Sequence, residues 1–285
     1  MLGCFPLVAV LALLAIAECA QPSIYFIVIS SVKSVKRRNA VRATWLTWLN
    51  KYEGRTGYKF FIDTPEDAED KQLVKNEMEA FGDLELLETR KGYVLLETNL
   101  RTWESLEVSY RKHGDKYDYY AMVHDDSFVC VQHFFHDAKY WPKTFVYISH
   151  LRAGEGDVIH IVGSQFAQRG IAETKKDPKM RDLIFDRMSE RINATTINDV
   201  TLFYGAFGIK KKHNDWKNGW VGIPLMTPAE KINFCNVALA AHQSYPEEML
   251  DLWVHVQRSK NRSKFPKPLL STDIMTLDKT VGYGE

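Results

Sequence analysis

The chain has 285 residues, of which 45% are hydrophobic and 12% aromatic, so it holds enough apolar material for a large core. This composition excludes low-complexity disorder and predicts one domain or two closely packed halves. Lysine and arginine number 37 against 36 acidic residues, and the formal net charge of +1 favours neither a nucleic acid nor any other polyanion as partner.

The chain begins with an apolar run from Leu2 to Ala17. A membrane-spanning helix needs about 20 apolar residues, which makes this run short for a span. The small residues Ala15 and Ala17 suit a cleavage site, although no lysine or arginine precedes the run. We therefore expect residues 1–20 to be a signal peptide or a signal anchor, and residues 21–285 to form a single domain. A buried core segment is the alternative.

Two further features agree with the secretory pathway. Asn193 and Asn261 each begin an Asn-x-Ser/Thr sequon, which is a glycosylation acceptor in a secreted protein. Outside the leader, Cys130 and Cys235 are the only cysteines, so they form the only possible internal disulfide pair. The sequence leaves open whether these two cysteines pair or stay free.

Strand and helix patterns alternate through the first half of the chain. The continuous β-branched and aromatic run from Ile24 to Ile29 predicts a strand that is buried on both faces. Further strands are expected over residues 58–62, 84–87 and 119–123, and helices over residues 34–49, 64–82 and about 96–113. This alternation predicts an α/β fold with a mostly parallel central sheet flanked by helices.

The second half of the chain has a looser pattern. Strands are expected over residues 145–148, 158–162 and 232–241, and helices over residues 175–191 and 246–257. In the last helix, Leu250, Trp253 and Val254 are expected to face inward. The sequence shows no internal repeat and no clear linker.

Two acidic residues, Asp125 and Asp126, stand directly after the predicted strand 119–123. Ligands of open α/β sheets bind at the carboxyl ends of the strands. Adjacent carboxylates at that edge suit a hard cation, which in turn holds a pyrophosphate. A turn in which aspartates cap backbone groups is the alternative, and this string alone does not decide between the two.

Other segments join the acidic motif. Residues 37–45 read Arg-Arg-Asn-Ala-Val-Arg-Ala-Thr-Trp, residues 124–128 read His-Asp-Asp-Ser-Phe, and residues 198–200 read Asn-Asp-Val. Residues 239–253 contain a histidine followed by Pro-Glu-Glu-Met. In this order they resemble the motifs Arg-Arg-x-Ala-Ile-Arg-x-Thr-Trp, Asp-Asp-Asp-x-Phe, Glu-Asp-Val and Val-His-x-x-x-Pro-x-Glu-Met of the β1,3-glycosyltransferase family. This family contains galactosyltransferases, N-acetylglucosaminyltransferases and the fringe enzymes.

The resemblance implies a GT-A-like, Rossmann-like domain and an inverting hexosyltransferase. Such an enzyme moves a sugar from a UDP-sugar to a glycan or glycoprotein hydroxyl in a β1,3 linkage; galactose is the family preference and N-acetylglucosamine the nearest alternative. By resemblance, Asp126 and His242 hold Mn²⁺, and Asp199 is the catalytic base. The implied location is the Golgi lumen or membrane, with secretion if the leader is cleaved and membrane contact only through the leader.

The resemblance also implies a nucleotide-sugar site. Arg38, Arg42 and Asp125 are expected to bind the donor, since guanidinium groups suit phosphate oxygens. The alternative for the two arginines is a solvated basic helix face. A polar-loop histidine, His213, is a rival metal ligand that ranks below His242.

Several positions depart from the family pattern. His124 replaces the first acidic residue of its motif, and Asn198 replaces a glutamate. The family's Gly-rich segment has only a vague counterpart at residues 166–170. These departures leave a second hypothesis, in which the chain is an inactive family member that binds glycans or stabilises a partner.

Overall fold

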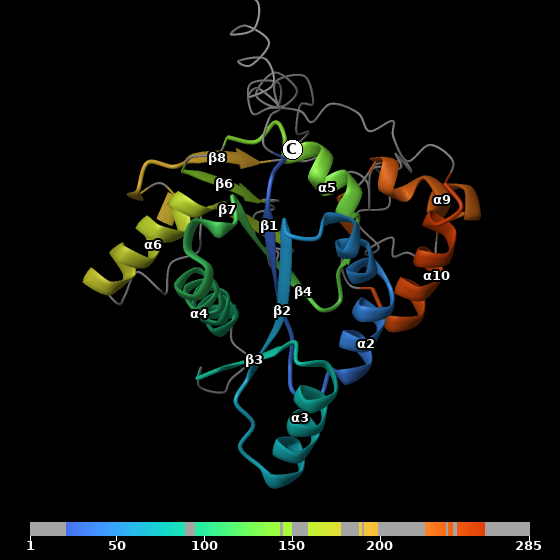
Figure 1. Ribbon diagram of the computed structural model, residues 1–285, viewed down its shortest axis with the longest axis horizontal. Coiled ribbons are helices and arrows are strands. Elements are labelled where there is room, and N and C mark those ends of the chain that lie inside the picture. The colour runs from blue at the N-terminus through green and yellow to red at the C-terminus, as the bar shows by residue number, and fades with distance from the viewer. Residues whose placement is uncertain are drawn as a thin grey trace, which may run out of the picture.

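The computed structural model of the protein describes residues 21–88, 95–142, 145–149, 159–177, 188–189, 191–198, 226–237, 239–241 and 244–259. A seven-stranded sheet in the order β3-β2-β1-β4-β7-β6-β8 lies at its centre (Figure 1). Its strands are β1 (Ile24–Ile29), β2 (Thr56–Asp63), β3 (Leu84–Leu87), β4 (Tyr119–His124), β6 (Val146–Ser149), β7 (Ile159–Gly163) and β8 (Thr195–Asn198). All pairings are parallel except those of β7 with β4 and β6, so the predicted mostly parallel α/β fold is confirmed.

The order of the strands creates a switch point beside β1. The chain runs from β1 to β2 and β3 on one side, and β4 then pairs with the opposite edge of β1. In open α/β sheets, ligands bind where the strand order reverses, outside the carboxyl ends of the strands. In this sheet that point is the carboxyl end of the β1–β4 pair.

Helices cover both faces of the sheet (Figure 1). The helical elements are α2 (Val35–Ala43), the 3₁₀ segment η1 (Trp45–Tyr52), α3 (Ala68–Phe81), α4 (Leu95–His113), the 3₁₀ turn η2 (Gly114–Lys116), α5 (Val131–Asp137), α6 (Ser164–Lys176), α9 (Pro228–Val237) and α10 (Pro246–Val256). Helices α4 and α6 lie on one side of the sheet, whereas α2, α5, α9 and α10 lie on the other (Figure 1). Among the described residues, no helix combines the length and apolarity that crossing a membrane requires.

Strand β1 shows why the sheet is buried on both faces. Its alternate residues Ile24, Phe26 and Val28 belong to a core cluster with α2, η1, α5 and α9. The residues between them face a second cluster with α4 and α6. Side chains alternate across a strand, so a continuous apolar run is required where both faces are covered.

The predicted strand at residues 232–241 is wrong. The chain forms α9 there, and only Ala240–Ala241 makes a short strand, β9, which pairs with β5 (Phe128–Val129). A capping box begins the helix: the Thr227 backbone N–H donates to the Glu230 carboxylate at 2.6 Å, and the Glu230 N–H donates to Thr227 Oγ1 at 3.4 Å. Pro228 also suits the first helical position.

Other helix predictions need correction. The expected helix 34–49 is divided into α2, which ends at Ala43, and the 3₁₀ segment η1, which begins at Trp45. Helix α6 was not predicted. The expected helix 175–191 overlaps α6 only at its start, and much of it lies outside the described residues. In α10, Leu250 and Val254 are 43% and 48% exposed, so their predicted inward orientation is wrong. The buried face of α10 consists of Met249, Leu252 and Val256.

Candidate functional site

The acidic motif lies at the switch point of the sheet. The Asp125 backbone N–H donates to the Ile29 carbonyl at 2.9 Å and so continues the β1–β4 pairing by one residue. Asp125 is buried, with 5% of the residue exposed. Its Oδ2 accepts a hydrogen bond of 2.6 Å from Ser30 Oγ. The first residue beyond β1 therefore contacts the first residue beyond β4.

A second segment comes to the same place from the end of the chain. Strand β9 pairs with β5 directly after the acidic motif, and the Ser244 N–H donates to the Asp126 carbonyl at 2.8 Å. Ala241 and Ser244 lie on either side of position 242 in the sequence. Ala241 pairs with Phe128, and Ser244 contacts Asp126. His242 itself lies outside the described residues.

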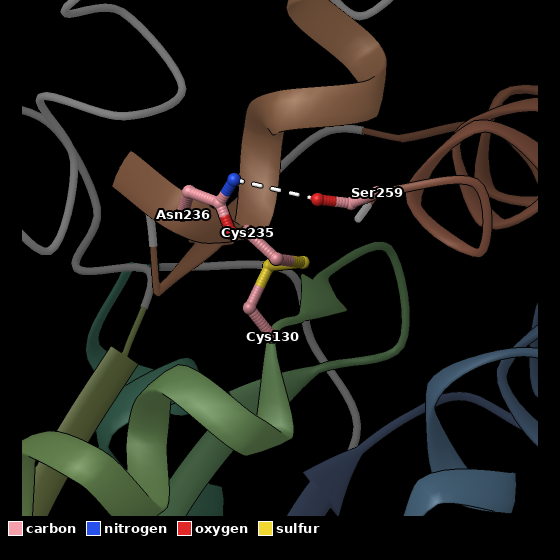
Figure 2. The surroundings of a disulfide bond; sticks show 4 residues. All are labelled: Cys130, Cys235, Asn236 and Ser259. Carbon is pink, nitrogen blue, oxygen red and sulfur yellow. Dashed lines mark hydrogen bonds between the residues drawn. A yellow bond between two sulfur atoms is a disulfide. The ribbon is translucent and has the colours of Figure 1, made fainter. Parts of the chain in front are cut away.

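A disulfide fastens this second segment. Cys130 and Cys235 are bonded, with their Cα atoms 5.3 Å apart, so the possible pair is confirmed. The bond joins the start of α5 to α9, and Asn236 beside it donates to Ser259 Oγ at 3.4 Å (Figure 2). The Cys130 N–H also donates to the Leu239 carbonyl at 2.8 Å. Covalent and backbone bonds therefore hold the β5–β9 pair behind the acidic motif.

Arg38 of α2 is fully buried. Its guanidinium donates to both carboxylate oxygens of Glu77, at 2.8 and 2.5 Å, and to Ser30 Oγ at 2.9 Å. It also donates to the carbonyls of Ser31 and Val32. The alternative of a solvated basic face is therefore wrong for Arg38, and a phosphate could reach this guanidinium only by displacing one of these partners.

Arg42 joins the same charged cluster. It donates to Glu77 at 2.7 Å and to both oxygens of Asp83 at 2.9 and 2.7 Å, and its guanidinium lies 4.0 Å from the Phe81 ring centroid. Burial alone would raise the pKa of Glu77, but hydrogen bonds from the two arginines bring it below the ordinary value. The predicted contact of Arg38 and Arg42 with a donor nucleotide stays a prediction.

Arg37 differs from its two neighbours in the motif. Its side chain is 39% exposed, and its contact within the described part of the chain is an ion pair of 3.6 Å with Asp125 Oδ1. Burial raises the pKa of Asp125, and the charge of Asp126 adds to the rise; the Ser30 hydrogen bond and the charges of Arg37 and Arg38 act against it.

His160 of β7 lies one strand away from the motif. Burial lowers its pKa to about 3, with a further contribution from His124, and it hydrogen-bonds the Tyr147 hydroxyl at 2.9 Å through Nδ1. His160 is therefore neutral across the physiological range, and it adds no cation next to the carboxylates.

Asp126 supplies one of the oxygen ligands that a hard divalent cation would need. A carboxylate at a strand end is an oxygen donor that Mn²⁺ accepts. Ser127 follows Asp126 in the sequence, and Ser244 donates its N–H to the Asp126 carbonyl. The hydroxyls of both serines are buried and make no hydrogen bond to the described residues. No group of three or more histidine, cysteine, aspartate or glutamate residues capable of holding a metal occurs within the described ranges. Asp126 would therefore need a ligand from elsewhere, such as His242.

Several predicted residues lie outside the described ranges, namely Asp199, His213, His242 and Asn261. Asn193 is described; it is exposed and has a left-handed φ of 53°. Sequence reasoning missed Ser30 and Glu77. Ser30 follows β1 as Asp125 follows β4, so the rule that identified Asp125 could also have identified Ser30. Glu77 follows Val74 by three residues on the buried face of α3, and a charge at that helical spacing from an apolar residue was the available signal.

The sequence of the chain matches a known family. Residues 36–155 match the model of the galactosyltransferase family. This segment is similar to the galactosyltransferase family. It contains the arginine motif at residues 37–45 and the acidic motif, whereas positions 199 and 242 lie beyond it. The chain is a glycosyltransferase, which uses a sugar donor and a glycan acceptor.

No curated protein matches the chain in sequence. Among solved structures, the chain is similar to a glycosyltransferase involved in the glycosylation of the major capsid of PBCV-1. The TM-score is 0.40 and the sequence identity 11%, over 81% of this chain and 99% of that chain.

Proposed function

We propose that the chain is an inverting, metal-dependent galactosyltransferase that moves galactose from UDP-galactose to a glycan hydroxyl in a β1,3 linkage. One observation carries this proposal: Asp125 and Asp126 stand at the carboxyl ends of β1 and β4, inside the segment that matches the galactosyltransferase family. Nucleotide ligands bind at such a switch point.

We assign Mn²⁺ to Asp126 and His242. Bound there, the cation would neutralise negative charge on the departing UDP. The contact between Ser244 and the Asp126 carbonyl supports this pairing, because it brings the chain next to position 242 against the acidic motif.

We assign proton removal to Asp199. In this step the Asp199 carboxylate accepts the proton of the acceptor hydroxyl, and the hydroxyl oxygen forms a bond to the anomeric carbon of galactose. The bond between that carbon and the UDP oxygen breaks, and UDP keeps the electron pair. A single displacement inverts the anomeric centre, so an α-linked donor yields a β-linked product.

We place the reaction in the secretory pathway, in the Golgi lumen or at its membrane. Disulfides persist in oxidising compartments, and the Cys130–Cys235 bond favours such a location. The exposed sequon at Asn193 also suits a lumenal protein.

The test is turnover of UDP-galactose by the full chain, with and without Mn²⁺, across a panel of β-linked acceptors, alongside Asp199→Asn. We expect Mn²⁺-dependent transfer that the variant abolishes, together with a β-linked product. If no donor sugar turns over and UDP does not bind in the presence of Mn²⁺, the proposal is wrong, and a non-catalytic family member that binds glycans or a partner becomes the better hypothesis.

A further inference from the structure

Ser30 occupies the carboxyl end of β1 with 6% exposure. Its backbone N–H donates to the Phe61 carbonyl of β2 at 2.9 Å, which fixes the position of its Cα atom. Its side-chain oxygen lies 2.9 Å from Arg38 Nη1 and 2.6 Å from Asp125 Oδ2. Ser30 is therefore the link between a buried guanidinium and the acidic motif.

The direction of these two hydrogen bonds follows from the chemistry of the groups. A guanidinium has donors only, so Ser30 Oγ must accept from Arg38. A hydroxyl has a single hydrogen, and the Ser30 hydroxyl is left to donate it to Asp125 Oδ2. The hydrogen bond from Ser30 thereby directs Asp125 Oδ2 toward the interior. The other oxygen, Asp125 Oδ1, lies 3.6 Å from Nη1 of the exposed Arg37.

The far end of this chain of bonds is anchored. Glu77 of α3 binds Arg38 through both carboxylate oxygens, and the carbonyls of Ser31 and Val32 accept from the same guanidinium. A bidentate pair of this kind defines the plane of the guanidinium. The Ser30 hydroxyl therefore has one low-energy orientation, toward Asp125.

We propose that Ser30 is a positioning residue, which transmits the Glu77–Arg38 anchor to Asp125 and holds its carboxylate in the orientation that binds the donor nucleotide. This inference rests on the proposed function, since it takes Asp125 to contact a UDP-sugar. It gives Arg38 a role behind the site, in addition to any role at the nucleotide.

The experiment compares Ser30→Ala with Ser31→Ala in the full chain. Ser31 is a matched control, because its hydroxyl pairs with Ser34 Oγ at 2.8 Å and only its backbone carbonyl contacts Arg38. UDP affinity in the presence of Mn²⁺ is measured by calorimetry, and KM and kcat for UDP-galactose are measured separately. Ser30→Ala is expected to weaken UDP binding about tenfold, equivalent to about 1.4 kcal/mol, and to raise KM more than it lowers kcat.

Ser30→Thr keeps the hydroxyl and is expected to restore most of the affinity that Ser30→Ala loses. Wild-type affinity in Ser30→Ala, or an equal loss in Ser31→Ala, would overturn the proposal. If Ser30→Ala does not fold, Ser30→Cys replaces it; its thiol is a weak donor, and unchanged UDP affinity in that variant would also overturn the proposal. Failure of the wild-type chain to bind UDP is a different result, which refutes the proposed function itself.

Discussion

Strands β1 and β4 carry a serine–aspartate pair at each end, and the two pairs behave differently. Ser23 bonds to Asp118 at the amino ends, and Ser30 bonds to Asp125 at the carboxyl ends. In each pair the serine and the aspartate are 95 residues apart in the sequence, because the parallel register aligns Ile24 with Tyr119. The same register thus produces the same pair twice.

The two residues of the amino-terminal pair hydrogen-bond each other in both directions. The Ser23 N–H and hydroxyl both donate to Asp118 Oδ2, at 2.9 and 3.0 Å, and the Asp118 N–H donates back to Ser23 Oγ at 2.9 Å. The carboxyl-terminal pair instead connects inward to Arg38 and outward to Arg37. The surroundings therefore decide the role: the first pair fastens two strand starts, whereas the second positions a carboxylate at the ligand-binding edge.

The largest expected effect comes from breaking the buried anchor of the carboxyl-terminal pair. Arg38→Ala leaves the Glu77 charge buried with only Arg42 as partner, and removing one member of a buried ion pair costs about 3–5 kcal/mol. Urea unfolding measures this loss. Arg37→Ala, the neighbouring exposed arginine, is the control and should stay within about 0.5 kcal/mol of wild type. Similar losses in the two variants would contradict the division between a buried and an exposed arginine.

The second prediction separates the two ends by activity. Asp126→Asn removes the proposed metal ligand at the carboxyl end and is expected to lower Mn²⁺-dependent turnover at least about 100-fold, since even outer-shell changes cost 10–100-fold. Asp118→Asn at the amino end of the same strand should turn over like wild type. Retention of more than a tenth of the activity in Asp126→Asn would rule out Asp126 as an essential metal ligand.

Local sequence patterns predicted the sheet around this site well and its distant partners poorly. Residues such as Ile27 and Val123 lie in continuous apolar runs, which require strands covered on both faces. The rule that ligands bind at carboxyl ends of strands then located Asp125. The contact of Ser244 with Asp126 and the bond of Arg38 to Glu77 join residues far apart in sequence, and no local pattern encodes such contacts. The α9 helix is different, because its Thr227–Glu230 capping box is a local signal in the sequence. The apolar residues after this box led to the wrong prediction of a strand.

The third prediction isolates the amino-terminal pair. Asp118→Ala removes the acceptor of two hydrogen bonds from Ser23 at a half-buried position. We therefore expect the free energy of unfolding to fall by about 1–2 kcal/mol. UDP affinity should not change, because this pair lies at the opposite end of the sheet from the acidic motif. A clear loss of UDP affinity in a folded Asp118→Ala chain would show that the two ends are coupled.

The smallest expected effect concerns the exposed arginine at the carboxyl end. Arg37→Ala should weaken UDP binding about fivefold, or about 1 kcal/mol, because Arg37 is the exposed cation beside Asp125 and surface charges act weakly in water. The loss should shrink as salt is added, since exposed charges are screened over about 8–10 Å. Lys36→Ala is the control: it removes an exposed charge from the adjacent position of α2 without changing any contact with the acidic motif. If both variants weaken UDP binding equally, the effect is one of net charge, and Arg37 does not contact the nucleotide.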